Sequence, residues 1–277
     1  MSAHPYSGAQ VAFATMHGKE QLARQPFLDI LNAEVVAPPA LDTDQFGTFS
    51  GEIARTLAPQ AAARVKARLG MKLSGTPYGL ASEGSFGAGL GYVVEHREVL
   101  MFIDEARGLE LVESAIDTSP LPSGRGIESI EGALGYAADL GYPRQGVVLS
   151  TRSGLIRKGM ETEDELTHAV GQLRERAGGL PIAISPDYRA HRCPSRAAVI
   201  VSLADRIARR LATPCPGCSA PGFGQVAYER GLRCSGCGEQ TRMIAADILG
   251  CGVCSHRVRQ SRAQRFASAE LCDFCNP

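Results

Sequence analysis

Short apolar runs alternate with helix-like runs along the first 212 residues. Apolar runs of about four to eight residues between Gly, Pro or charged residues are typical of buried strands, and longer amphipathic runs are typical of helices. The pattern predicts strands at 11–14, 34–37, 78–82, 98–104, 108–114, 146–151 and 180–185. It predicts helices at 20–31, 59–73, 127–140, 162–177 and 195–213.

The order of these elements predicts an α/β domain with three layers. Alternating strands and helices favour a sheet that is covered by helices on both faces. The strands at 98–104 and 108–114 are separated only by residues 105–107, so they should form a hairpin. We therefore expect residues 1–212 to contain a mixed β-sheet, with the hairpin as its antiparallel part.

At Pro214 the long periodic runs stop, and Gly, Cys and short β-like pieces begin. Eight of the nine cysteines lie beyond this point, in four CxxC pairs with gaps of 15, 13 and 17 residues: Cys215 and Cys218, Cys234 and Cys237, Cys251 and Cys254, Cys272 and Cys275. A CxxC turn directs two thiolates at one ion, and two such turns complete a tetrahedral zinc site. Residues 213–277 are therefore predicted to form a tandem zinc-ribbon domain with two zinc ions.

Spacing leaves the pairing of the four CxxC turns open. The first two pairs fit one ribbon and the last two fit a second, but pairing the first with the third and the second with the fourth is also compatible. Eight cysteine ligands leave no open coordination position, which indicates structural zinc. His256 follows Cys254 by two residues and is interpreted as a surface residue, with zinc ligation as the alternative.

Composition favours a cytoplasmic protein. Lys plus Arg (29) equals Asp plus Glu (29), so there is no overall basic field for nucleic acid. The start of the chain lacks the pattern of a secretory signal, and no apolar run approaches the ~20 residues of a membrane span.

Four tail arginines could contact phosphates, but eight thiolates and two zinc ions sum to about −4 and offset them. These arginines are Arg257, Arg259, Arg262 and Arg265.

The stretch ATMHGKE, residues 14–20, lies between a predicted strand and a predicted helix. Gly18 permits close approach of a ligand to the backbone, Lys19 carries a mobile charge, and the helix start offers free N–H groups, which together suit an anion. Thr15 and His17 would line the same turn. The stretch lacks the pattern of a P-loop, and the plain alternative is an ordinary β–α connection.

Two acidic segments follow. Asp44 and Glu52 belong to a loop rich in carboxylates and hydroxyls, and Glu83 ends an apolar strand ahead of Ser85 and flexible glycines. Carboxylates at a strand end beside a Gly-rich loop suit Mg²⁺ and phosphate. A solvated turn and a surface carboxylate are the alternatives.

A further polar segment, DYRAHRCPSR, follows the strand at 180–185. Arg189 and Arg192 offer guanidinium groups for phosphate or carboxylate, and His191 offers a titratable ring. In the alternative interpretation Asp187 pairs with Arg189 while Ser195 caps the next helix. The adjacent Cys193 lacks a third group to orient it as a nucleophile.

ATMHGKE, DTDQFGTFSGEI, ASEGSFG, DYRAHRCPSR and the four CxxC pairs together resemble an uncharacterised bacterial family, a domain of unknown function. The resemblance covers nearly the whole chain and implies no activity. From this resemblance we expect Asn at the position of Cys193, which argues further against a catalytic cysteine.

The TxxxK loop ending at Lys19, the Ala- and Lys-rich helix at 59–73 and the strand entering ASEGSFG resemble the layout of house-cleaning inosine/xanthosine triphosphatases. This resemblance implies that Lys19 meets phosphate, that Glu83 holds a metal, and that Asp44 or Glu52 adds a carboxylate. The Asn that precedes the loop lysine in those enzymes is absent, and the GTFSGE loop has no counterpart.

These observations favour a Mg²⁺-dependent enzyme, such as a phosphohydrolase, for a phosphorylated small molecule or nucleotide. Lys19 with Arg189 or Arg192 would position the phosphate, and Glu83 or Asp44 would orient water. The first alternative is a module that senses a ligand and contacts nucleic acid or protein through its zinc ribbons. In the second, the ribbons serve only for dimerisation or capping.

Overall fold

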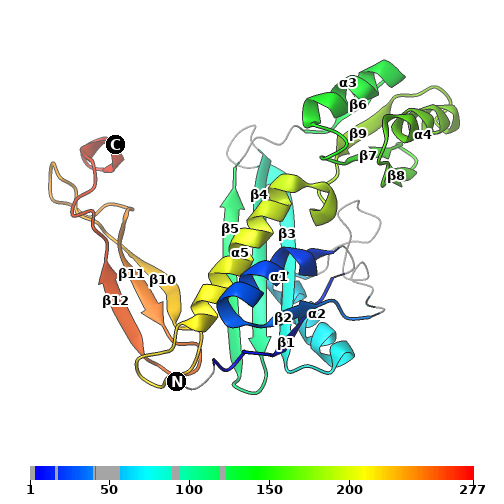
Figure 1. Ribbon diagram of the computed structural model, residues 1–277. Coiled ribbons are helices and arrows are strands. Elements are labelled where there is room, and N and C mark those ends of the chain that lie inside the picture. The colour runs from blue at the N-terminus through cyan, green and yellow to red at the C-terminus, as the bar shows by residue number, and fades with distance from the viewer. Residues whose placement is uncertain (1–3, 16–17, 40, 42–56, 89–93, 119–122) are drawn as a thin grey trace.

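The computed structural model describes residues 4–15, 18–39, 41, 57–88, 94–118 and 123–277. His17, Asp44 and Glu52 lie outside the described residues. Figure 1 shows a central five-stranded sheet with helices on both faces, a smaller α/β unit at one end and the cysteine-rich ribbon at the other.

The five-stranded sheet is mixed, as the sequence predicts. Its order is β2-β1-β3-β4-β5, in which β1 runs parallel to β2 and β3, and β3, β4 and β5 form an antiparallel meander. The elements in this part of the chain are β1 (Gln10–Phe13), α1 (Lys19–Leu31), β2 (Glu34–Val36), α2 (Pro59–Ser74), β3 (Tyr78–Ala88), β4 (Val94–Asp104) and β5 (Leu109–Asp117).

Alternating side chains of the central strands create the three predicted layers. On β4, Leu100 and Phe102 pack in the core with α1 and with α5 (Pro194–Ala212). Met101 and Ile103, which point the other way, pack in a second core with α2. Because successive residues of a strand face opposite sides, one apolar run supplies both cores.

The part of the chain between β5 and α5 forms a second sheet. Its order is β6-β9-β7-β8, and all neighbouring strands are antiparallel. Helices α3 and α4 cover one face, where Leu149, Ile184 and Leu166 belong to a separate core. The elements are β6 (Arg125–Ile127), α3 (Ile130–Leu140), β7 (Val147–Ser150), β8 (Ile156–Lys158), α4 (Glu163–Arg176) and β9 (Ile182–Pro186). Strand and helix periodicity does not specify which strands pair, so the sequence could not distinguish one sheet from two.

Local sequence explains several helix starts. Thr162 caps α4 with a capping box, in which its side chain accepts a hydrogen bond from the Glu165 N–H. Pro59 and Pro194 occupy the first turns of α2 and α5, where a missing N–H has no cost. The N-cap of α5 is Cys193, and it makes no side-chain cap hydrogen bond, so the expectation that Ser195 caps this helix is wrong.

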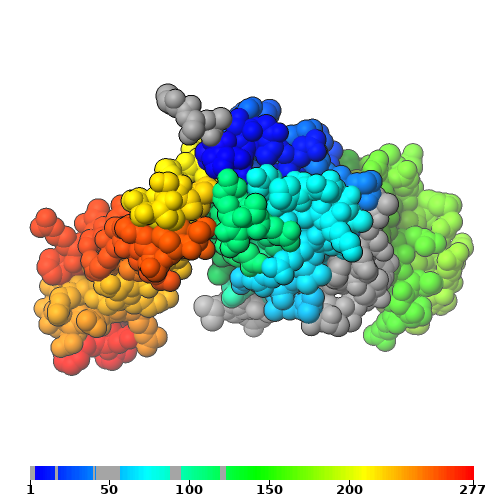
Figure 2. Space-filling view, turned by 90° about the horizontal axis from the view of Figure 1, so that it is seen from below, coloured from blue at the N-terminus to red at the C-terminus, as the bar shows by residue number. Residues whose placement is uncertain are grey.

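The ribbon is a three-stranded antiparallel sheet of β10 (Gly224–Arg230), β11 (Ile244–Gly250) and β12 (Arg257–Ser261). Seen from below, it lies at one end of the five-stranded domain and the α/β unit lies at the opposite end (Figure 2). Among the helices of the described residues, none has the length and apolar character needed to span a membrane.

Candidate zinc sites and a buried charge cluster

The eight tail cysteines form two tetrathiol groups. We call Cys215, Cys218, Cys251 and Cys254 the proximal zinc site, and Cys234, Cys237, Cys272 and Cys275 the distal zinc site. Sγ–Sγ distances are 3.7 Å for two pairs of the proximal site, and 3.8 and 3.7 Å for two pairs of the distal site. A tetrahedron with Zn–S bonds of about 2.3 Å has edges of about 3.8 Å, so each group can hold one zinc ion.

The pairing is therefore first with third and second with fourth, and the topology of the ribbon explains it. Successive strands of an antiparallel sheet run in opposite directions. The first CxxC pair precedes β10 and the third connects β11 to β12, so both lie at the same end of the sheet. The second connects β10 to β11 and the fourth follows β12, so both lie at the other end.

Backbone N–H groups support the thiolates. The Gly217 N–H donates to Cys215 Sγ and the Gly236 N–H donates to Cys234 Sγ, both at 3.3 Å. His256 is outside the tetrathiol groups, and its ring packs beside Gly217, with its centroid 5.8 Å from that of Phe223. His256 therefore packs against the proximal site without joining it.

The proximal zinc site is packed on the five-stranded domain. A Cβ atom at Gly252, inside the third CxxC turn, would lie 2.4 Å from Leu109 Cδ1. A Cβ atom at Gly222 would lie 3.1 Å from Leu111 Cδ1 and 3.2 Å from Leu109 Cδ2. Arg210 of α5 donates to the Gly222 carbonyl and pairs with Glu113 of β5. These contacts fix one end of the ribbon to β5 and α5.

Two of the four tail arginines are held by acidic partners. Arg259 makes a two-pronged ion pair with Glu229, and Arg262 makes one with Asp247. Intramolecular pairing reduces the charge that these two arginines could offer to a phosphate backbone.

A separate cluster of charged side chains surrounds β3 between Ser82 and Gly84. Lys19, the first residue of α1, donates to the hydroxyl of Ser82 at 3.0 Å and to its carbonyl at 3.3 Å. From the other layer, Lys66 of α2 pairs with Glu83. The two lysines reach β3 from opposite faces, because Ser82 and Glu83 point to opposite sides.

Glu98 of β4 is the centre of the network on the α5 side. Arg196 donates from Nε to Glu98 Oε2 at 2.8 Å and from Nη2 to Oε1 at 3.0 Å, while His96 Nε2 lies 2.8 Å from Oε2. Arg196 also donates to the Tyr188 carbonyl at 2.8 Å. Exposed fractions of the side chains are 1% for Arg196 and 0% for Glu98, so this ion pair lies in the interior.

The charges of the cluster shift two pKa values. Burial would raise the pKa of Glu98, but Arg196 and then His96 outweigh it and hold that pKa well below its usual range. Burial, followed by the positive charge of Arg196, lowers the pKa of Lys19 to about 8, although Glu98 and Glu83 act in the opposite direction. Lys19 can therefore change charge near neutral pH.

Three aromatic rings border the cluster. Phe86 of β3 stacks on His96 with ring centroids 4.3 Å apart and on Tyr188 with centroids 4.1 Å apart. Tyr188 follows β9, so this stack joins the five-stranded sheet to the smaller α/β unit.

The structure brings only some of the predicted site residues together. Lys19 and Glu83 belong to the cluster, Gly18 precedes α1 in a left-handed conformation (φ 68°), Thr15 is buried after β1, and Ser85 is half-buried on β3.

Of the segment DYRAHRCPSR, Arg196 belongs to the cluster and Tyr188 borders it, whereas the predicted site residues Arg189, His191 and Arg192 lie elsewhere. Arg189 pairs with Asp187, as the alternative interpretation predicted. Arg192 bonds the Met160 carbonyl and Glu161, and His191 is exposed in a short 3-10 turn.

Glu98, His96 and Lys66 were not recognised as candidates from the sequence. The available signal was weak: Glu98 opens the apolar run EVLMFID, where a buried charge requires a partner. That partner, Arg196, is 98 residues away in the chain, and only the folded structure brings it to β4.

Gly84 lies opposite Glu98 in the β3–β4 register, and a Cβ atom there would be 2.1 Å from Glu98 Oε2 and 2.7 Å from Arg196 Nη2. We expect Gly84→Ala to lower the free energy of unfolding by about 1–3 kcal/mol, because the buried ion pair must shift. Gly87→Ala on the same strand is the matched control, since nothing lies within 4 Å of its added Cβ. Urea denaturation of both variants tests this; equal stability would show that the ion pair adjusts freely.

The chain belongs to the family described as "Domain of unknown function (DUF6671)", whose model matches residues 66–277. This confirms the resemblance to a family of unknown function. A search of curated proteins found no match. A PelC dodecamer from Paraburkholderia phytofirmans is similar over 42% of this chain and 73% of that chain, with 15% identity and a TM-score of 0.23. A likeness at this level adds nothing to the fold or the function.

Proposed function

We propose that the five-stranded domain binds the phosphate group of a small molecule, such as a nucleotide, and acts on it as a Mg²⁺-dependent enzyme. The observation that supports this most is the charge cluster around β3. Lys19, Lys66 and Arg196 gather around the carboxylates of Glu83 and Glu98 on β3 and β4. Cationic groups brought together in a region of low dielectric constant favour the approach of an anion.

The start of α1 supports the same function. Gly18 adopts a left-handed conformation at the N-cap, and no side chain caps this helix. The first-turn N–H groups and the Lys19 ammonium group are therefore placed at one helix terminus, an arrangement that favours phosphate. Lys19 is half-buried, and its ammonium group donates to the hydroxyl and the carbonyl of Ser82.

Magnesium would supply further charge neutralisation for the phosphate. The carboxylates that would hold it in this proposal are those of Asp44, Glu52 and Glu83. Glu83 is paired with Lys66, so a metal at Glu83 would have to displace this lysine. Dependence on Mg²⁺ is therefore tested separately from phosphate binding.

Lys19→Met is expected to weaken binding of inorganic pyrophosphate or a nucleoside triphosphate about 10- to 100-fold, because a charged hydrogen bond to phosphate is lost. Affinity of the unsubstituted protein should fall as pH rises through about 8, where Lys19 loses its proton, and this dependence should be absent in Lys19→Met. Isothermal titration calorimetry with and without Mg²⁺ measures both effects, and phosphate release measures turnover.

The control is Lys72→Met, because Lys72 is an exposed lysine on α2, the helix that also carries Lys66. Equal affinity of the Lys19 and Lys72 variants would refute the proposed phosphate site at Lys19. Phosphate binding without turnover, with or without Mg²⁺, would support the binding site and refute the proposal that the protein is an enzyme.

The alternative is a binding module in which the ribbon contacts a protein or nucleic acid. It is favoured by three large apolar side chains near the distal zinc site that are more than half exposed: Phe266, Leu271 and Phe274. If the partner is a nucleic acid, retention of the protein on DNA or RNA should fall steeply with salt and should require Arg257 and Arg265. If retention is independent of salt and of these arginines, nucleic acid is excluded as the partner.

A further inference from the structure

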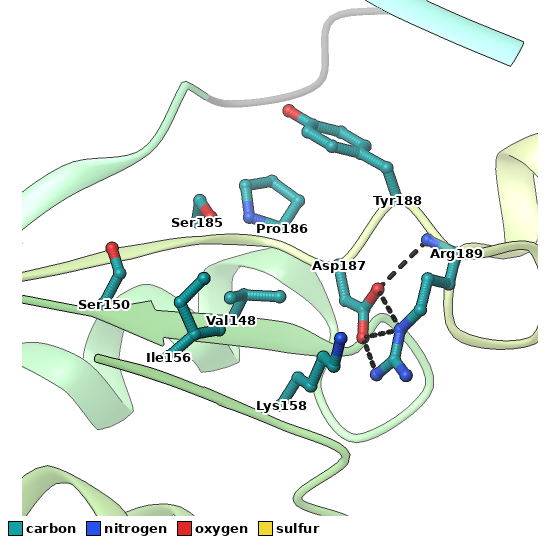
Figure 3. Close-up of a pocket in the computed structure, with 9 residues that line it drawn as sticks. All are labelled: Val148, Ser150, Ile156, Lys158, Ser185, Pro186, Asp187, Tyr188 and Arg189. Atoms are coloured by element: carbon teal, nitrogen blue, oxygen red, sulfur yellow. Dashed lines mark hydrogen bonds and ion pairs between the residues drawn. The ribbon is translucent and has the colours of Figure 1, made fainter. Parts of the chain in front are cut away.

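A pocket of about 150 Å³ lies on the face of the smaller sheet that α3 and α4 leave open (Figure 3). Val148 of β7 forms part of its floor and is paired with Ser185 of β9 in the strand register. Ser150 follows two residues later on β7, so it lies on the same face, paired with Ile156 of β8. Leu149, between Val148 and Ser150, points to the other side, into the core with the helices.

The charged side chains that line the pocket are engaged within the chain. The buried Asp187 accepts hydrogen bonds from Arg189 Nε at 3.0 and 3.1 Å and from the Arg189 backbone N–H at 3.0 Å. Lys158 also interacts within the chain. An ion that entered the pocket would lose hydration and would find these charges already engaged, so a neutral ligand is favoured.

Two serine hydroxyls line the same pocket. Ser150 and Ser185 are half-buried, and neither hydroxyl has a hydrogen-bond partner among the residues that the structure describes. A serine hydroxyl can both donate and accept, so each can meet a carbonyl oxygen or an N–H group of a ligand. Because Val148 is paired with Ser185, the two serines are diagonal neighbours on β7 and β9, about 7–8 Å apart. One ring with polar groups on two of its edges can reach both.

Size and apolar surface favour a single planar ring. A cavity of about 150 Å³ holds one six-membered ring. Val148, Ile156 and Pro186 supply aliphatic surface, and Tyr188 supplies an aromatic ring. Phe86 stacks on the Tyr188 ring with centroids 4.1 Å apart, which holds this wall of the pocket in place.

We propose that this pocket binds a neutral six-membered heteroaromatic ring that carries both C=O and N–H groups, the chemistry of a pyrimidine base. The ring lies between Tyr188 and the aliphatic floor, and its polar groups meet Ser150 and Ser185. An apolar ring of the same size would leave both hydroxyls unpaired. The site is separate from the charge cluster, because Lys19 and Glu98 do not line it.

Fluorine NMR of 5-fluorouracil with the zinc-loaded full chain, at a mildly acidic pH where the ring is neutral, tests this proposal. We expect saturable binding with a dissociation constant on the order of 1 mM or tighter, and at least about fivefold weaker binding of fluorobenzene and of para-fluorobenzoate. Ser150→Ala and Ser185→Ala should each weaken binding of 5-fluorouracil about 3- to 10-fold, because one hydrogen bond is lost. Ser202→Ala is the matched control, since Ser202 is exposed on α5 and does not line the pocket.

Three results would overturn the proposal. These are absence of saturable binding, equal affinity for 5-fluorouracil and either of the other two rings, or unchanged binding of 5-fluorouracil in both serine variants. Thermal denaturation of each variant verifies that loss of binding is not loss of fold. Lys19→Met should bind 5-fluorouracil as the unsubstituted protein does, so failure of the proposed phosphate site and failure of this pocket are distinguishable.

A free base and the base of a nucleotide present the same ring to the pocket, and 5-fluorouridine 5′-triphosphate separates them. If it binds more tightly than 5-fluorouracil and this gain is lost in Lys19→Met, the pocket is supported as the base site of a nucleotide held at the proposed phosphate site. Equal affinity for the two probes supports a free base as the ligand.

Discussion

Cys251→Ser is expected to release the ribbon from the five-stranded domain, whereas Cys272→Ser should leave it attached. Structural zinc contributes about 10–16 kcal/mol to the folding of small zinc domains, so losing one ligand set unfolds the segment that it holds. Cys251 belongs to the proximal zinc site, whose Gly252 packs on Leu109 of β5. Cys272 belongs to the distal zinc site at the opposite end of the ribbon.

Hydrogen exchange measured by mass spectrometry, with zinc quantified on the same samples, separates the two outcomes. In Cys251→Ser, exchange should rise in the ribbon, in β5 around Leu109 and at the end of α5. In Cys272→Ser, the rise should be confined to residues 231–243 and 262–277. The control is Cys193→Ser, because Cys193 is buried outside both tetrathiol groups and its variant should retain all zinc. Identical exchange maps for the two zinc-site variants would refute the docking role of the proximal site.

Glu98→Gln should lower the free energy of unfolding by about 3–5 kcal/mol, the usual cost of removing one charge from a buried pair. The substitution removes the carboxylate charge that pairs with the Arg196 guanidinium group, whose side chain is 1% exposed. A matched control lies on the same helix: Arg209 and Asp205 form a two-pronged pair of similar geometry, with side chains 69% and 37% exposed. Asp205→Asn should cost about 0.5 kcal/mol or less.

The pH dependence of stability provides a second measurement. Because the folded protein lowers the pKa of Glu98, this carboxylate stabilises the fold above the usual pKa of a glutamic acid, and that contribution is lost as pH falls through the folded pKa. When urea denaturation is measured between acidic and neutral pH, the free energy of unfolding of Glu98→Gln should therefore fall less toward acidic pH than that of the unsubstituted protein. Equal costs for Glu98→Gln and Asp205→Asn would mean that the interior pair contributes no more than a surface pair.

A double variant tests whether the pair itself is favourable. Replacing both Glu98 and Arg196 by methionine removes both buried charges, so we expect a smaller loss of stability than in Glu98→Gln alone. A larger loss would mean that the hydrogen bonds of Arg196 to the Tyr188 carbonyl and of Glu98 to His96 outweigh the cost of burying the charges.

Periodicity predicted the three-layer domain and the spacing of cysteines predicted eight zinc ligands, because both signals are local in the chain. The pairing of the CxxC turns required the order and direction of β10, β11 and β12, which no spacing contains. In the same way Lys19 and Glu83 could be proposed from their own segments. Their actual partners, Ser82 and Lys66, depend on which face of β3 each side chain occupies.

The close fit of Gly84, Glu98 and Arg196 also limits how these positions can diverge among relatives. Any side chain at position 84 would occupy the space of the Glu98 carboxylate, and loss of either charge would leave the other buried. We expect substitutions at the three positions to occur together: family members with a larger residue in place of Gly84 should also lack the Glu–Arg pair. An alignment in which position 84 varies independently of the other two would show that the strands separate locally in those proteins.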